Sequence, residues 1–242
     1  MGSVTVVTSG KGGVGKSTVA VGVSAALADM GRKVLLLDCD AGLRSLDRLT
    51  GVDRELVYDV SDVVHGRCSP ADAIYKCSEN LSLMPAPQSG EDAVRPETMK
   101  KLTELLRKYF DHVILDSPAG VGMGFRSACL PADRALVVCN PDPVCVRSTA
   151  RVHGLLTKMG ISDQRLIINR FDRKNFLKLN GFSDLDAVID EAQIRLIGLV
   201  PDDVRFVSSL LRNEPDEKSR GAKACGRIAA RVEGRNIPLF SD

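Results

Sequence analysis

The sequence predicts an α/β fold, with a mostly parallel, twisted sheet of about seven to eight strands and helices on both faces. Two observations support this. Short apolar runs alternate with longer helical patterns through most of the chain, and the apolar runs are unbroken rather than interleaved with polar residues. Unbroken apolar strands separated by helices are typical of parallel sheets whose two faces are both covered.

The strands are expected at residues 4–8, 33–37, 81–85, 112–115, 134–139, 164–169 and 195–200. The helices are expected at residues 17–30, 96–110, 146–159, 203–212 and 221–233. Residues 88–95 and 173–184 are polar or mixed in composition and are expected to be surface loops. With 242 residues, no internal repeat and no linker, residues 1–242 are expected to form a single domain.

A glycine-rich loop follows the first expected strand and reads Gly-Lys-Gly-Gly-Val-Gly-Lys-Ser-Thr. It satisfies the pattern G-x-x-x-x-G-K-[ST] and stands between a strand and a helix, where backbone N–H groups and the helix dipole favour phosphate. Lys16 is expected to reach the β- and γ-phosphates of a nucleotide, and the Ser17 hydroxyl to bind Mg²⁺. The expected nucleotide contacts are Gly10, Lys11, Gly12, Gly13, Val14, Gly15, Lys16, Ser17 and Thr18.

Acidic residues follow two further strands, at the sheet edge where ligands of parallel sheets bind. Asp116 ends an apolar run and is expected to support Mg²⁺, and the N–H of Gly120 is expected to reach the γ-phosphate. A strand-end aspartate that only caps a turn is the alternative for Asp116. Asp38 and Asp40 lie two residues apart, so one can support the metal while the other orients the attacking water.

Lys11 is a second lysine within the loop. Its ammonium can turn toward its own phosphates, extend to those of a partner chain, or remain solvated without a role.

Composition excludes several classes of protein. The net charge is only +2 and no run of five like charges occurs, so bulk electrostatics does not favour nonspecific nucleic-acid binding. The seven cysteines form no C-x-x-C pair, which disfavours a metal ribbon or cluster and fits a reducing cytoplasm. No apolar stretch approaches the length of a membrane span, and no leading signal segment is seen.

The loop resembles the deviant Walker A motif of the MinD/ParA family of ATPases, from Lys11 to Thr18. Three further segments resemble the MinD branch: residues 38–47, which read Asp-Cys-Asp-Ala-Gly-Leu-Arg-Ser-Leu-Asp; residues 116–120, which read Asp-Ser-Pro-Ala-Gly; and Asn-Pro-Asp at 140–142 before a helix with Arg147. The resemblance extends from the first strand to about residue 240, nearly the whole chain.

The resemblance implies a cytoplasmic ATPase that uses ATP and Mg²⁺, dimerises face to face around two ATP molecules, and returns to a monomer after hydrolysis. Lys11 would be the signature lysine that crosses to the partner's phosphates, and Asp40 would position the water. Asn169 resembles the adenine-recognition position, and Pro201 would pack near the base. The implied function is positional control through protein partners of the MinC and MinE type, with the division site as the expected target.

The end of the chain departs from the MinD pattern. Members of that branch continue into a short basic amphipathic segment that docks on anionic membrane, whereas residues 234–242 contain Pro238 and no apolar face. Either the chain is a relative without this segment, or the segment has been removed. Membrane binding is therefore expected to be weak or absent. Peripheral contact with the inner face of the cell membrane is the alternative.

Three other functions share this loop. A ParA-type DNA-partitioning ATPase needs a basic surface for nonspecific DNA, which the balanced charge does not favour. Iron–sulfur carriers and reductases need paired cysteines that bridge subunits, and the sequence contains no C-x-x-C pair. Amidoligases and synthetases act on small metabolites and stay open as a less favoured class.

Overall fold

The computed structural model describes residues 1–176, 181–214, 216 and 218–239 of the 242-residue chain. Its centre is an eight-stranded sheet in the order β3-β4-β2-β5-β1-β6-β7-β8. The strands are β1 Ser3–Thr8, β2 Val34–Asp38, β3 Tyr75–Lys76, β4 Leu81–Met84, β5 His112–Asp116, β6 Arg134–Cys139, β7 Asp163–Phe171 and β8 Arg195–Pro201. Every neighbouring pair is parallel except β3 with β4, which confirms the expected sheet.

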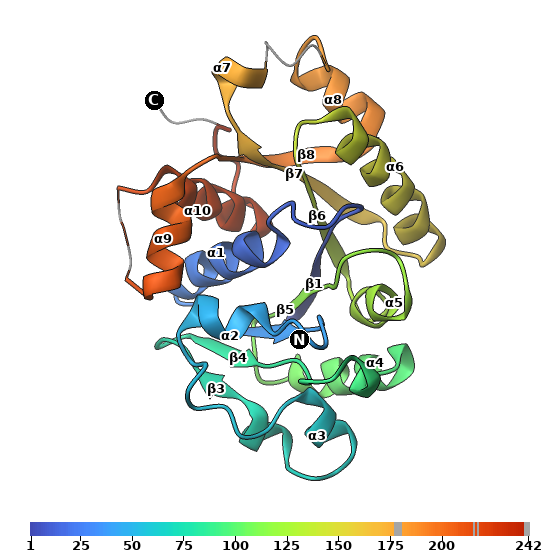
Figure 1. The fold of residues 1–242 in the computed structure, drawn as a ribbon, viewed down its shortest axis with the longest axis vertical. Helices are drawn as coiled ribbons and strands as arrows, with labels where there is room; N and C mark the ends of the chain where they lie inside the picture. The colour runs from blue at the N-terminus through green and yellow to red at the C-terminus, as the bar shows by residue number, and fades with distance from the viewer. Residues whose placement is uncertain (177–180, 215, 217, 240–242) are drawn as a thin grey trace.

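Helices cover both faces of this sheet, as Figure 1 shows. On one side lie α1 Lys16–Asp29, α2 Ser45–Thr50, α9 Val204–Arg212 and α10 Arg220–Val232. On the other lie α4 Pro96–Leu106, α5 Met123–Cys129, α6 Pro143–Lys158 and α8 Leu185–Ala192. Two shorter helices, α3 Val60–Val64 and α7 Arg173–Phe176, lie toward opposite ends of the molecule.

The strands are apolar because they are buried from both sides. All five residues of β2 and of β5 are buried, including the polar ends Asp38 and Asp116. Burying each aliphatic side chain removes about 1.5–3 kcal/mol of unfavourable hydration, which offsets the ordering of the chain. The same burial removes the carboxyl groups of Asp38 and Asp116 from water, which raises the pKa of both groups.

Several expected boundaries were wrong. The helix expected at 146–159 begins earlier, at Pro143, because Asp142 caps it: Asp142 Oδ1 accepts a hydrogen bond from the Cys145 N–H at 3.0 Å. The helix expected at 96–110 ends at Leu106, where Arg107 forms the cap.

Two expected loops were also only partly right. The loop expected at 173–184 begins with the helix α7, and its residues 177–180 lie outside the described part of the chain. The loop expected at 88–95 holds a short 3-10 turn, Gly90–Asp92.

Candidate functional site

Most of the predicted site residues gather at the carboxyl ends of β1, β2 and β5, whereas Asn169 and Pro201 lie on β7 and β8. These strands are direct neighbours, and their register places Asp38 of β2 opposite Asp116 of β5, which in turn is opposite Val7 of β1. The glycine loop leaves the end of β1 and enters α1 at Lys16. One edge of the sheet therefore brings the loop and both acidic segments together.

The loop backbone has a shape that glycine alone fits well. Gly15 has a φ of +91°, and a Cβ there would lie 2.4 Å from Asn169 Nδ2. At Gly10 a Cβ would lie 2.4 Å from the carbonyl oxygen of Ser148 in α6. The backbone is thus pressed between β7 and α6, with Val14 buried at the middle of the loop.

Asn169 fixes the loop from the side. It is a buried residue of β7, and its Nδ2 donates a hydrogen bond to the Val14 carbonyl oxygen at 2.7 Å. A buried side-chain hydrogen bond of this kind costs about 1–3 kcal/mol when one partner is removed. The sequence pattern suggested a base-recognition position for Asn169, and the contact with the loop was not foreseen. Pro201 ends β8 and pairs with Phe171 of β7.

Lys16 and Ser17 begin α1. The Lys16 side chain is almost buried, so its ammonium group requires a nearby anion. Ser17 and Thr18 are half-buried, and Ser17 Oγ accepts a hydrogen bond from Ser45 Oγ of α2 at 3.2 Å. This contact joins the loop to the segment after β2, and no spacing in the sequence predicted it.

Burial raises the pKa of the two strand-end carboxyl groups. The pKa of Asp38 rises to about 8, first because of burial and then because Asp116 is close. Burial also raises the pKa of Asp116 to about 7, although the Ser17 side chain and the Lys16 ammonium act in the opposite direction. Asp38 Oδ1 accepts a hydrogen bond from the Asp40 N–H at 2.8 Å.

Asp116 is the clearest sign that the site accepts a metal ion. Both of its carboxylate oxygens are buried, and no hydrogen bond of ordinary geometry reaches either from the described residues, although the Ser17 side chain lies close enough to lower the pKa of Asp116. Mg²⁺ prefers oxygen ligands and uses one or two carboxylates together with phosphate and water. A hydroxyl from Ser17 and carboxylates from Asp38 and Asp116 fit that donor set.

Asp40 differs from the two buried acids. It is half-buried and lies two residues beyond Asp38, past the end of β2. Its pKa is raised by burial and lowered in part by Lys16. A carboxylate that keeps contact with water beside a lysine can orient a water molecule. Gly120, after β5, is half-buried, and no described atom lies within 4 Å of the place a Cβ would occupy.

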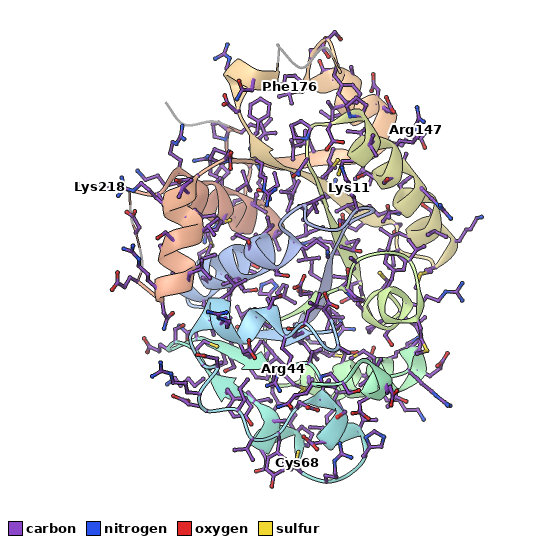
Figure 2. All side chains as sticks on the ribbon, viewed as in Figure 1. Lys11, Arg44, Cys68, Arg147, Phe176 and Lys218 are labelled. Carbon is purple, nitrogen blue, oxygen red and sulfur yellow. The ribbon has the colours of Figure 1, made fainter. Side chains whose placement is uncertain are left out.

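Lys11 points away from the buried centre. Its side chain is 48% exposed, and Nζ lies 3.7 Å from Asp142 Oδ1, which caps α6. Figure 2 shows Lys11 at the loop that leads into α1, and Arg147 on the outer side of α6. The partner of Lys11 was not predicted, although an aspartate directly before a proline at a helix start is a recognisable capping signal.

Membrane-spanning structure is not seen in the described residues, because none of their helices is both long and apolar enough to cross a bilayer. Within the same described part of the chain, no group of three or more histidine, cysteine, aspartate or glutamate side chains could hold a metal ion by itself. This is compatible with Mg²⁺ that is bound partly by phosphate and water.

Comparisons with known proteins agree with this geometry. The family model described as "ParA: NUBPL iron-transfer P-loop NTPase" matches residues 1–210. The septum site-determining protein MinD of Bacillus subtilis is 40% identical over 99% of this chain and 92% of its own length.

Solved structures show the same likeness. The MinC:MinD cell division complex of Aquifex aeolicus has a chain 36% identical to this one, with a TM-score of 0.89 and 99% of each chain covered. MinD of Pyrococcus horikoshii, solved with Mg-ADP, is 31% identical, with a TM-score of 0.86 and 96% of each chain covered. The chain therefore belongs to the MinD/ParA family of P-loop ATPases, in the MinD branch of cell-division proteins.

Proposed function

We propose that this chain is an ATP-driven switch in division-site placement, which binds Mg·ATP, dimerises in the ATP state, and returns to a monomer on hydrolysis. One observation carries the proposal. Two buried carboxyl groups, Asp38 and Asp116, lie beside a glycine loop whose Lys16 is nearly buried. A site with this charge pattern is completed by a polyphosphate and a divalent cation, which supply the missing partners for both signs of charge.

Lys16 and the loop backbone hold the phosphates in this proposal. The N–H groups of residues 10–17 and the start of α1 favour anions, and Lys16 adds a cation where the β- and γ-phosphates lie. Ser17, Asp38 and Asp116 hold Mg²⁺, which neutralises phosphate charge when bound. Asn169 keeps the Val14 carbonyl in place, so the loop is ready before the nucleotide arrives.

Hydrolysis needs little covalent chemistry from the protein. A water oxygen attacks the γ-phosphorus, the bond to the bridging oxygen breaks, and ADP leaves with that electron pair. Asp40 accepts a hydrogen bond from the attacking water and orients it, because its carboxylate is the one that keeps contact with solvent. Gly120 supplies a backbone N–H to the γ-phosphate.

Lys11 connects chemistry to assembly. An exposed ion pair such as that with Asp142 is worth only about 0–1 kcal/mol, so Lys11 can leave Asp142 at little cost. In a face-to-face dimer it extends to the phosphates of the partner's nucleotide. Two facing ATP molecules repel each other, and the crossed lysines offset that repulsion.

Protein partners are proposed from the relatives. The Aquifex aeolicus relative was solved in a complex with MinC, and we infer that the ATP-bound dimer of this chain binds a MinC-type protein and responds to a MinE-type protein. Nonspecific DNA is not expected to bind, because the net charge of the chain is only +2. A DNA mobility shift that fades with added salt would instead favour the ParA-type function.

The variant Lys11→Ala tests the switch. It should retain ATP binding, since Lys16, the loop amides and Mg²⁺ remain, while ATP-dependent dimerisation and phosphate release fail together. Nucleotide affinity, mass by light scattering and phosphate release are measured on the same preparation. Lys101→Ala, which removes an exposed lysine on α4, is the matched control. Parental dimerisation and turnover in Lys11→Ala would disprove the crossed-lysine mechanism.

A further inference from the structure

Two cysteines lie at the two ends of one turn beside the nucleotide site. Cys139 is the last residue of β6, and Cys145 lies in the first turn of α6. Both side chains are fully buried, and both thiols are free. Residues 140–144 join them, and this turn carries Asp142, the partner of Lys11.

The two sulfur atoms meet around a single residue. Cys139 Sγ donates a hydrogen bond to the Asn140 carbonyl oxygen at 3.1 Å, and the Asn140 N–H donates to Cys145 Sγ at 3.3 Å. The two thiols also lie close enough for each to shift the pKa of the other. Asp142 holds the Cys145 N–H at 3.0 Å and fixes the turn.

The surroundings make Cys145 the more acidic thiol of the two. The contact with Cys139 lowers the pKa of Cys145, and the Asn140 N–H and the Lys11 cation lower it further, whereas burial and the Asp142 carboxylate act in the opposite direction. The same contact raises the pKa of Cys139. A cysteine near a helix N-terminus and a lysine is the usual setting of a reactive thiolate. By contrast, burial raises the pKa of the Cys225 thiol to about 12.

We propose that Cys139 and Cys145 form a modification site: hydrogen peroxide oxidises the pair to an intrachain disulfide, which slows the ATPase cycle. In the first step the Cys145 thiolate attacks a peroxide oxygen, the O–O bond breaks, and hydroxide leaves, which gives a sulfenic acid. In the second, the Cys139 sulfur attacks the Cys145 sulfur and the S–O bond breaks. The leaving oxygen departs as water with the Cys139 proton. The thiols lose two electrons and the peroxide gains them.

Access to the pair requires only a small opening. The cover over Cys145 is the start of α6, where Pro143 is exposed and the Val144 side chain is 65% exposed. A first helical turn at the surface opens at low free-energy cost compared with global unfolding. Peroxide is little larger than water and can enter through such an opening, whereas bulky reagents are excluded.

The effect on the ATPase rests on the proposed function. A disulfide would tie the end of β6 to the start of α6 and reset the turn that carries Asp142. Asp142 both caps α6 and holds Lys11, so the bond acts on the residue proposed to reach the partner's nucleotide. Reduction would return the turn to its original form.

The first experiment follows the bond itself. The full chain is treated with hydrogen peroxide, its free thiols are alkylated in denaturant, and it is digested with trypsin. Residues 135–147 form one tryptic peptide that carries Cys139 and Cys145 and no other cysteine. This peptide should lose two hydrogen atoms before Cys225 reacts, because its contacts lower the pKa of the Cys145 thiol whereas burial raises that of Cys225. If both its thiols stay alkylatable while Cys68 and Cys77 are oxidised, the proposal is wrong.

The second experiment follows the consequence. Peroxide should reduce phosphate release by the parent chain, and dithiothreitol should restore it. The double variant Cys139→Ser, Cys145→Ser should keep its turnover in peroxide, whereas Cys225→Ser, which removes a buried thiol of α10, should remain sensitive. If the disulfide forms in the 135–147 peptide and turnover is unchanged, the proposed effect of the disulfide on the ATPase cycle is wrong. If the reduced chain shows no turnover, the proposed function fails, while the mass of the peptide still decides whether the disulfide forms.

Discussion

Asp116→Asn should stabilise the metal-free and nucleotide-free protein at pH 8. Burial raises the pKa of Asp116 from 3.8 to about 7, so the folded state keeps a proton that the unfolded state has released. Stability is therefore present in full below about pH 4 and falls as the pH rises through 7. At about 1.4 kcal/mol per pKa unit, the ionised carboxyl costs up to about 4 kcal/mol, and a neutral amide of the same shape avoids that cost.

The assay is urea unfolding at pH 5 and pH 8, with and without Mg²⁺ and ADP. The variant should gain clearly less stability at pH 5 than at pH 8, because pH 5 lies only about one pH unit above the unfolded pKa of 3.8. Mg²⁺ with ADP should stabilise the parent at pH 8 more than the variant, because the cation replaces the missing partner of Asp116. Asp53→Asn, at an exposed aspartate, is the matched control. Equal stability of parent and variant at pH 8, or a gain at pH 5 as large as that at pH 8, would refute the argument.

Three further substitutions test the loop and the water-orienting acid. Lys16→Ala should abolish ATP binding because the nearly buried cation at the phosphates is lost, and micromolar affinity by calorimetry would contradict this. Asp40→Ala should keep ATP binding but slow phosphate release by a factor on the order of 10², since only the orientation of water is lost; unchanged turnover would make Asp40 structural. Gly15→Ala should cost about 1–3 kcal/mol of stability and weaken nucleotide binding, because its Cβ would lie 2.4 Å from Asn169 Nδ2; parental melting and affinity would show that the loop can relax.

The sequence predicted the sheet well because strands of a parallel sheet that are buried on both faces appear as unbroken apolar runs. Each of the seven expected strands is present, with ends that shift by a few residues, as at β7 Asp163–Phe171. The eighth, β3 Tyr75–Lys76, has two residues and is antiparallel, so it leaves no periodic pattern to detect. Short helices were missed for a similar reason, although Asp184, which caps α8, was a signal that could have been used.

The part of the site that consists of short sequence motifs could be predicted. The loop and the strand-end acids Asp38 and Asp116 follow from motif and strand order, and the structure brings them together. Contacts between distant segments could not be predicted. Ser45 donates to Ser17, and Asn169 donates to Val14, because tertiary packing puts these pairs in reach, and no spacing in one sequence specifies either contact.

The Asn169 to Val14 hydrogen bond also bears on how the chain is made. The glycine loop leaves the ribosome early, yet its brace lies 155 residues later, in a strand that docks beside β6. A growing chain thus displays the phosphate motif long before that motif can hold its working shape. The loop therefore gains this support only once synthesis has passed β7, so copies truncated before that strand would hold the phosphate motif less firmly.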